Sequence, residues 1–262
     1  MNKAVLLGMR LALAVVLTLG ARSVWADDDG PSACRDLPSY AALRNALEAA
    51  RAQANGGFNL EMWATLVNRD GVVCAVTFTG DSRGDQWPGS RVISAQKANT
   101  ANAFSLPGLA LSTANLFTAV QPGGSLFGLQ ESNPVNTSVA YGGSPSNYGR
   151  SNDPMVGGRI GGVNVFGGGL ALYNSSGRLV GGIGVSGDSS CADHNIAWRT
   201  RHTLNLDNVP AGVSGDAARP DNIVYDITPQ SGQMPGTSAS GWGHAACSAA
   251  ATTIAAGLPP TN

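Results

Sequence analysis

The three histidines are the residues best suited to bind a metal ion, because neutral imidazole is a common metal ligand. His194 and His202 lie on one expected helix, eight residues apart, which separates them by about 12 Å along the helix axis. They therefore cannot share one metal ion. His194 is the candidate metal ligand, alone or together with His244, and a packing role for its ring is the alternative.

The turn before that helix has the composition of an anion site. Gly187, Asp188 and Ser189 precede a helix expected at 191–204. The first amides of a helix have no partner within it and carry partial positive charge, so a carboxylate can bind there. The alternative is that Asp188 or Ser189 caps the helix with its own side chain.

Two basic side chains on an earlier helix are candidates to contact the same anion. Lys97 is the only lysine after Lys3, and Arg91 precedes it by six residues, so the two lie on different parts of the helix surface. Either can meet an anionic ligand. The alternative is a solvated or salt-bridged role.

Two glycine-rich stretches are superficially similar to known catalytic or nucleotide-binding loops. The stretch 157–162 lacks the spacing of a dinucleotide fingerprint, and no Walker lysine follows it. Gly184-Val-Ser-Gly-Asp188 differs from a hydrolase elbow because Asp188 replaces the final glycine. We interpret both stretches as structural.

The elements that must position these residues follow from the apolar pattern. Helical spacing predicts helices at 39–54 and 90–104, with a short one at 112–120, and the runs 62–78 and 167–186 each predict a β-hairpin. Hairpins separated by helices predict an α+β fold with an antiparallel sheet flanked by helices. The loop-like segment 121–162 is expected to cover the ligand.

The N-terminus has the layout of a secretory signal peptide. Lys3 and Arg10 precede an apolar run at 11–19, and Val24-Trp-Ala26 offers a cleavage site after small residues. The run is short for a transmembrane helix. The sequence therefore predicts a signal at 1–26, a periplasmic or extracellular location, and no membrane attachment after cleavage.

The four cysteines fit such a compartment. None has another cysteine within five residues, the spacing that a zinc site favours, so disulfide bonds are expected. Cys34 and Cys74 fall in the N-terminal half, and Cys191 and Cys247 in the C-terminal half. We therefore predict the pairs Cys34 with Cys74 and Cys191 with Cys247.

Composition limits the partners of the chain. Charged residues make up only 13% of the sequence and the formal net charge is -1, without the basic cluster that nucleic acids require. A small-molecule ligand is the expected partner. Because such a poorly charged surface resists association weakly, we also expect a homo-oligomer.

Four motifs of the chain are similar in order and spacing to those of a known family. They are Asn68-Arg-Asp-Gly71, Ala95-Gln-Lys-Ala-Asn-Thr-Ala101, Gly167-Gly-Gly169, and Gly181-Gly-Ile-Gly-Val-Ser-Gly187 followed by Asp193 and Ala197. Over residues 37–210 the sequence resembles the GlcG/HbpS-like family. The resemblance implies a profilin-like sheet, oligomeric assembly and, in several members, binding of haem or its iron.

The resemblance turns these separate expectations into one hypothesis. Together with the signal peptide, it gives an exported haem-binding or haem-handling domain at 27–210. The extension at 211–262 exceeds the usual domain of the family, and we expect it to pack on the domain. His194 would ligate the iron, and the amides after Gly187, with Lys97 or Arg91, would hold a carboxylate. The alternative function is an accessory or catalytic domain acting on a small organic acid.

Overall fold

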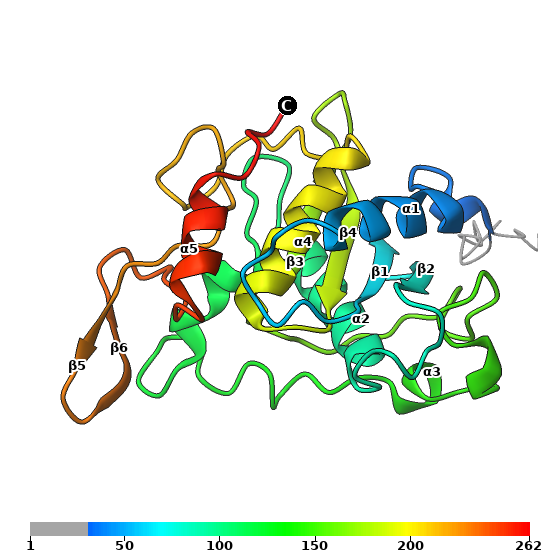
Figure 1. Ribbon diagram of the computed structural model, residues 1–262, viewed down its shortest axis with the longest axis horizontal. Coiled ribbons are helices and arrows are strands. Elements are labelled where there is room, and N and C mark those ends of the chain that lie inside the picture. The colour runs from blue at the N-terminus through cyan, green and yellow to red at the C-terminus, as the bar shows by residue number, and fades with distance from the viewer. Residues whose placement is uncertain (1–30) are drawn as a thin grey trace, which may run out of the picture.

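The fold is built around a four-stranded antiparallel sheet (Figure 1). A computed structural model describes residues 31–262, so the predicted signal at 1–26 lies outside the described residues. The strand order is β2-β1-β4-β3, so each predicted hairpin forms and the two hairpins join through their β1 and β4 strands. The strands are β1 (Trp63–Asn68), β2 (Val73–Phe78), β3 (Gly169–Tyr173) and β4 (Leu179–Ser186).

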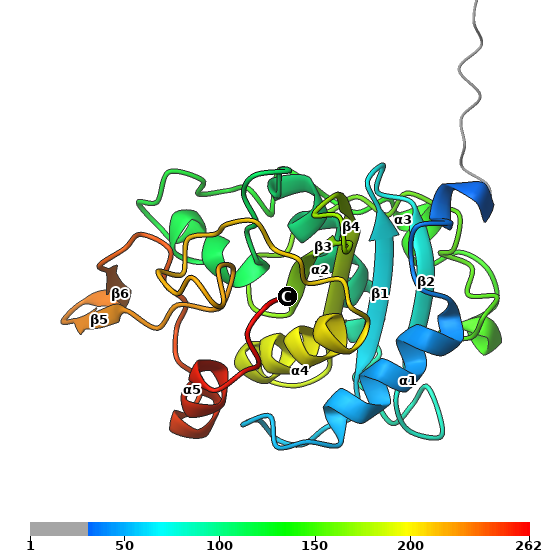
Figure 2. The ribbon, with the colours of Figure 1, turned by 90° about the horizontal axis from the view of Figure 1, so that it is seen from above.

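Three helices cover the two faces of this sheet. The helices α1 (Tyr40–Arg51) and α4 (Ser190–Thr203) lie side by side on one face, and α2 (Ser90–Phe104) lies on the other (Figure 2). A serine directly precedes each of α1 and α4 as its N-cap. Its side chain accepts a hydrogen bond from the backbone amide of the third helical residue. The predicted α+β arrangement with helices flanking an antiparallel sheet is confirmed.

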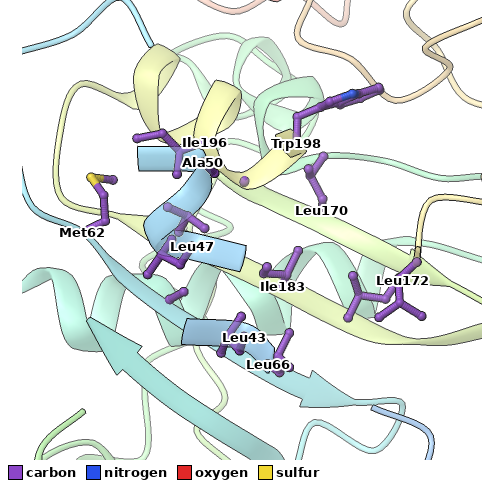
Figure 3. Close-up of a cluster of buried hydrophobic side chains, with 14 of the residues drawn as sticks. Leu43, Leu47, Ala50, Met62, Leu66, Leu170, Leu172, Ile183, Ile196 and Trp198 are labelled. Carbon is purple, nitrogen blue, oxygen red and sulfur yellow. The ribbon is translucent and has the colours of Figure 1, made fainter. Parts of the chain in front are cut away.

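A single apolar core fills the space between the sheet and the helices α1 and α4. Leu43 and Leu47 from α1 and Ile196 from α4 belong to one buried apolar cluster with Leu66 and Ile183 of the sheet (Figure 3). All five side chains are buried, which is the largest favourable contribution to folding for residues of this type. This core fixes the position of the first turn of α4.

The glycines of β4 allow α2 to lie directly on the sheet. A Cβ atom on Gly184 would lie 1.9 Å from the carbonyl oxygen of Ser94, and one on Gly182 would lie 2.3 Å from that of Ala98. No side chain fits in either space. The interpretation of this glycine run as structural is therefore confirmed.

The segment between α2 and β3 is mostly irregular, as expected. It contains only short helices, and the helix predicted at 112–120 is instead two 3-10 helices, Thr113–Leu116 and Thr118–Val120. The short helix α3 (Thr137–Ala140) and a 3-10 turn at Pro145–Asn147 follow. The amide of Val73 donates to the carbonyl of Gly158, so this segment also covers the outer edge of β2.

The C-terminal extension contains elements that the sequence pattern did not predict. A hairpin of β5 (Ile227–Gln230) and β6 (Gln233–Ser238) projects from the body, and α5 (Ala249–Ala256) packs near α4 (Figures 1 and 2). Helical periodicity is weak in α5, because alanine and threonine dominate its sequence. The domain limits at 27–210 and 211–262 stay a prediction.

Buried polar contacts attach the extension to α4. The Arg201 guanidinium forms a two-point ion pair with Asp221, and the indole nitrogen of Trp198 donates to the carbonyl of Pro259 at 2.9 Å. Both disulfide bonds have the predicted pairing, Cys34 with Cys74 and Cys191 with Cys247. The second bond therefore joins the extension to the start of α4.

The helices described within residues 31–262 include none with the length and apolar content needed to cross a membrane.

Candidate functional site

His194 lies in the interior of the protein, on α4 beneath the extension. Its side chain is fully buried, its Nε2 accepts from the amide of Ile223 at 3.2 Å, and that nitrogen lies 3.1 Å from Asn222 Oδ1. Burial lowers the pKa of His194 to about 3, so the ring is neutral. A neutral ring suits a metal ligand. Residues 222 and 223 occupy its Nε2, while its buried Nδ1 has no hydrogen-bond partner within the described residues.

The other two histidines lie in different surroundings. His244 is buried, accepts from the amide of Gly167 at 3.3 Å, and packs on the ring of Phe117. Burial lowers the pKa of His244 to about 4. His202 is more open: its side chain is 37% exposed, and its Nδ1 lies 2.7 Å from Asp207 Oδ2. Such a carboxylate contact leaves Nε2 as the nitrogen available to a metal.

These histidines do not assemble into a metal centre with acidic residues or cysteines. Within residues 31–262, no cluster of three or more His, Cys, Asp or Glu side chains is placed to hold one ion.

The turn at the start of α4 satisfies its own amides. Ser189 Oγ accepts from the amide of Ala192, and the amide of Asp188 donates to Asp193 Oδ1 at 2.9 Å. The amide of Cys191 lies 3.3 Å from Cys247 Sγ. Ser189 is therefore the cap, which was the structural alternative for this turn. A carboxylate ligand there would have to replace these contacts.

Gly187 and Asp188 hold the turn against the chain that leads into β1. A Cβ atom on Gly187 would lie 2.4 Å from the carbonyl oxygen of Glu61, so only glycine fits. The Asp188 carboxylate accepts from the amides of Phe58 and Leu60 at 2.9 and 3.1 Å. Asp188 also lines a cavity of about 290 Å³ next to Arg51.

Lys97 forms a buried ion pair instead of facing a pocket. Its Nζ donates to Asp193 Oδ2 at 2.6 Å and to the carbonyl of Val185 at 3.1 Å. Burial lowers the pKa of Lys97, and it raises the pKa of Asp193 to about 6, an effect that Lys97 opposes. The family-like motifs around Lys97 and Asp193 therefore meet in space.

Arg91 lies in a different place from Lys97. Its guanidinium forms a two-point ion pair with Asp153, donates to the carbonyl of Ala140 at 2.8 Å, and stacks at 3.6 Å on the ring of Tyr148. These contacts bind the 140–153 segment to the first turn of α2. The sequence-predicted residues thus divide into two groups, one around Lys97 and one around Arg91.

A cavity of about 410 Å³ lies beside Arg91, and we call it the α2 cavity. Its lining is mainly apolar and comes from β1, the loop before α2, the first turn of α2 and the 141–148 segment. The side chains in its walls include Trp63, Arg83, Pro88, Val92, Tyr141 and Tyr148. This volume lies within the range of small-molecule sites, roughly 300–1,000 Å³.

The polar groups that border the α2 cavity include several hydrogen-bond donors. The N-cap of α2 is Gly89, which offers no side-chain cap to the first amides of the helix. Arg83 is exposed, and the buried indole nitrogen of Trp63 has no hydrogen-bond partner within the described residues. Apolar walls combined with donors suit a flat, apolar molecule that carries a carboxylate.

Sequence reasoning predicted Arg91 but missed the other residues of the α2 cavity. The available signal was the turn Trp87-Pro-Gly89 directly before a helix that has no capping side chain. A second and larger cavity, of about 820 Å³, is lined by polar residues of both charge signs, including Asp81, Arg44 and Arg150. Its mixed lining identifies no single ligand chemistry.

The four-stranded antiparallel sheet, with helices on both faces and glycines along β4, defines a domain of the α+β class. The family model of haem-degrading HbpS-like proteins matches residues 39–201, which include β1 to β4 and most of α4. The chain belongs to the HbpS-like family. None of the curated protein sequences matches it significantly.

Several solved structures are also similar to this chain. A crystal structure of a PduOC–haem complex is 24% identical, with a TM-score of 0.45 over 64% of this chain and 94% of that one. The Klebsiella pneumoniae protein ORFY is 22% identical, with a TM-score of 0.43 over 64% and 90%. A double-mutant form of HbpS from Streptomyces reticuli is 18% identical, with a TM-score of 0.39 over 78% and 99%.

Proposed function

We propose that this protein is an exported member of the HbpS-like family that binds or handles haem. The observation that carries the proposal is the family match over residues 39–201, which takes in the whole sheet and the motifs around Lys97 and Asp193. The description of that family names haem as the molecule that its members degrade.

The residues predicted to contact haem differ in how open they are to a ligand. Residues 222 and 223 occupy Nε2 of His194, which leaves its Nδ1, buried and without a partner within the described residues, as the nitrogen that could bind iron. The anion role of Gly187, Asp188, Ser189 and Lys97 stays a prediction, as does iron ligation by His194. The ring of His202 is more exposed than that of His194, so His202 is the second histidine to test as an iron ligand.

Export is the second part of the proposal. Two disulfide bonds support it, because such bonds persist in the periplasm and outside the cell and are rare in the cytosol. N-terminal sequencing of the mature protein after cell fractionation tests it. A mature chain that begins near residue 27, in the periplasmic or extracellular fraction, is expected; a full-length chain in the cytosol would contradict it.

Self-association is the third part. Large apolar side chains are exposed at several places, among them Phe58, Trp87 and Phe127, at 74%, 53% and 66%. Burial of such side chains against a second copy would favour a homo-oligomer. Light scattering of the mature protein at micromolar concentration is expected to give a mass above that of one chain, and a monomer would refute this part.

Titration of the purified mature protein with haemin tests the central proposal. A Soret band that shifts and saturates is expected. The spectra of His194→Ala and His202→Ala then show which histidine, if either, ligates the iron. If haemin does not bind, the alternative gains support, and a rise of Tm with a small organic acid would establish it.

A further inference from the structure

We infer that the α2 cavity is a binding site for a planar, apolar molecule that carries a carboxylate. The inference deepens the proposed function, on which it rests for the identification of haem, a flat macrocycle with carboxylate side chains, as the natural ligand. It assigns the ligand to the first turn of α2 and not to the start of α4.

The shape and chemistry of the walls carry the first step. Tyr141, whose side chain is exposed, offers a ring face, and Trp63, Tyr148, Pro88 and Val92 add apolar atoms to the walls. Ring faces of this kind favour stacking on flat ligands. A small hydroxy acid would leave most of this apolar lining without contact.

The rigidity of the walls is the second step. Arg91 is buried, and its ion pair with Asp153 and its stacking on Tyr148 hold the floor of the cavity in one place. The Tyr148 hydroxyl donates to the carbonyls of Tyr141 and Gly142 at 3.1 and 3.2 Å, which holds the outer wall. Binding to a preformed cavity loses less conformational entropy than binding to a loose loop.

The distribution of charge is the third step. Arg83 lies at the rim, is exposed, and forms no ion pair within residues 31–262. Asp85, in the same loop, is occupied by the amides of Asp81 and Ser82, at 3.0 and 2.7 Å. The amide of Ser90 donates to the carbonyl of Trp87 at 2.9 Å, so Arg83 and the next amides of the first turn of α2, which have no side-chain cap, remain for a carboxylate.

The unpaired indole of Trp63 is the fourth and independent observation. The Trp63 side chain is only 2% exposed, it lines the cavity, and its Nε1 has no acceptor within the described residues. A buried donor without a partner is uncommon because it loses its hydrogen bond to water. A ligand in the cavity that carries an acceptor near this ring would remove that cost.

Gly89 allows a sharp test. It lines the cavity, its φ of -63° suits any residue, and a Cβ atom there would meet nothing within 4 Å. Gly89→Phe should therefore fold and fill the mouth of the cavity. Gly108 also has open space around a Cβ atom and lies outside the cavity, so Gly108→Phe is the matched control.

The experiment titrates the mature wild-type protein and variants with haemin, metal-free protoporphyrin and 1-pyrenecarboxylate, followed by absorbance and fluorescence. We expect Gly89→Phe to raise Kd by at least about tenfold, because a blocked pocket loses most of its apolar contact. We expect Arg83→Gln to raise it by roughly three- to tenfold through loss of a charged contact. Gly108→Phe should bind as the wild type does, and near-UV circular dichroism checks that every variant folds.

The outcomes separate the two proposals. Haemin binding that neither Gly89→Phe nor Arg83→Gln weakens would overturn the site inference and leave haem binding intact. Binding of 1-pyrenecarboxylate that Gly89→Phe abolishes, without any haemin binding, would support the site and overturn the haem function. Failure of all three probes to bind the wild type would overturn both.

Discussion

Lys97 Nζ lies 2.6 Å from Asp193 Oδ2, and the two side chains join α2 on one face of the sheet to α4 on the other. Both side chains are buried, so water does not solvate either charged group. The carbonyl of Val185 accepts a second hydrogen bond from Lys97, at 3.1 Å. The pair is therefore a structural link across the end of β4.

Removal of one partner of this pair should destabilise the fold strongly. Lys97→Met leaves a buried carboxylate uncompensated, and we expect a loss of about 3–5 kcal/mol in the free energy of unfolding. The double variant Lys97→Met/Asp193→Asn should lose less than Lys97→Met alone. Urea denaturation measures both. Arg178→Met, which breaks an exposed pair with Asp36, is the control and should cost at most about 1 kcal/mol.

The contact of α2 with β4 predicts a second sensitive position. Gly184→Ala places a methyl group 1.9 Å from the carbonyl oxygen of Ser94, so α2 must move away from the sheet. We expect a loss of about 1–3 kcal/mol or more, typical of overpacking. Gly108→Ala meets nothing within 4 Å and is the control. Equal stability of the two variants, measured by urea denaturation, would show that α2 does not pack as described.

The main body of the fold was predictable because its signals are local. Helical spacing of apolar residues predicted α1 and α2, the capping residues after Gly187 predicted α4, and the turns Asp70-Gly71 and Ser176-Gly177 predicted both hairpins. The hairpin of β5 and β6 was missed because Pro229, Pro235 and Gly236 interrupt its strands, a composition that is rare in strands.

The candidate site was only partly predictable because its chemistry depends on distant partners. Lys97 and Arg91 were recognised as the important cations, yet nothing local showed that Asp193 and Asp153 would neutralise them. Likewise, the residue that covers His194 comes from the extension, 28 positions later in the chain. Contacts of such sequence separation leave no periodic pattern, and only the fold reveals them.

The disulfide bond Cys191–Cys247 should control how firmly the extension is held. It closes a loop with a sequence separation of 56, and its removal in Cys191→Ala/Cys247→Ala should cost about 2–4 kcal/mol. Amide hydrogen exchange in α5 should become faster at the same time. Cys34→Ala/Cys74→Ala, which removes the other bond, should destabilise the protein without a selective effect on α5. Selective loss of protection in α5 in this second variant would contradict the assignment.

The two buried histidines should make the protein sensitive to mild acid. Burial lowers the pKa of His194 to about 3 and that of His244 to about 4, from the ordinary value of 6.5. As the pH falls below 6.5, the unfolded chain binds protons that the folded chain does not bind, so the free energy of unfolding decreases, down to about pH 4 through His244 and about pH 3 through His194. Asp193 acts in the opposite sense. Its pKa is about 6 in the fold and 3.8 ordinarily, so between these pH values the folded chain binds a proton that the unfolded chain does not, and this increases the free energy of unfolding.

Variants can separate these opposing contributions. His244→Gln keeps an acceptor for the amide of Gly167 but removes one titrating group, so the loss of stability between pH 6 and 4.5 should become shallower by up to about 1.4 kcal/mol per pH unit. Asp193→Asn should make the same loss steeper, because the compensating proton uptake disappears. Urea denaturation at a series of pH values measures both slopes. A slope that stays the same in His244→Gln would mean that His244 titrates normally in the fold and is not held neutral by burial.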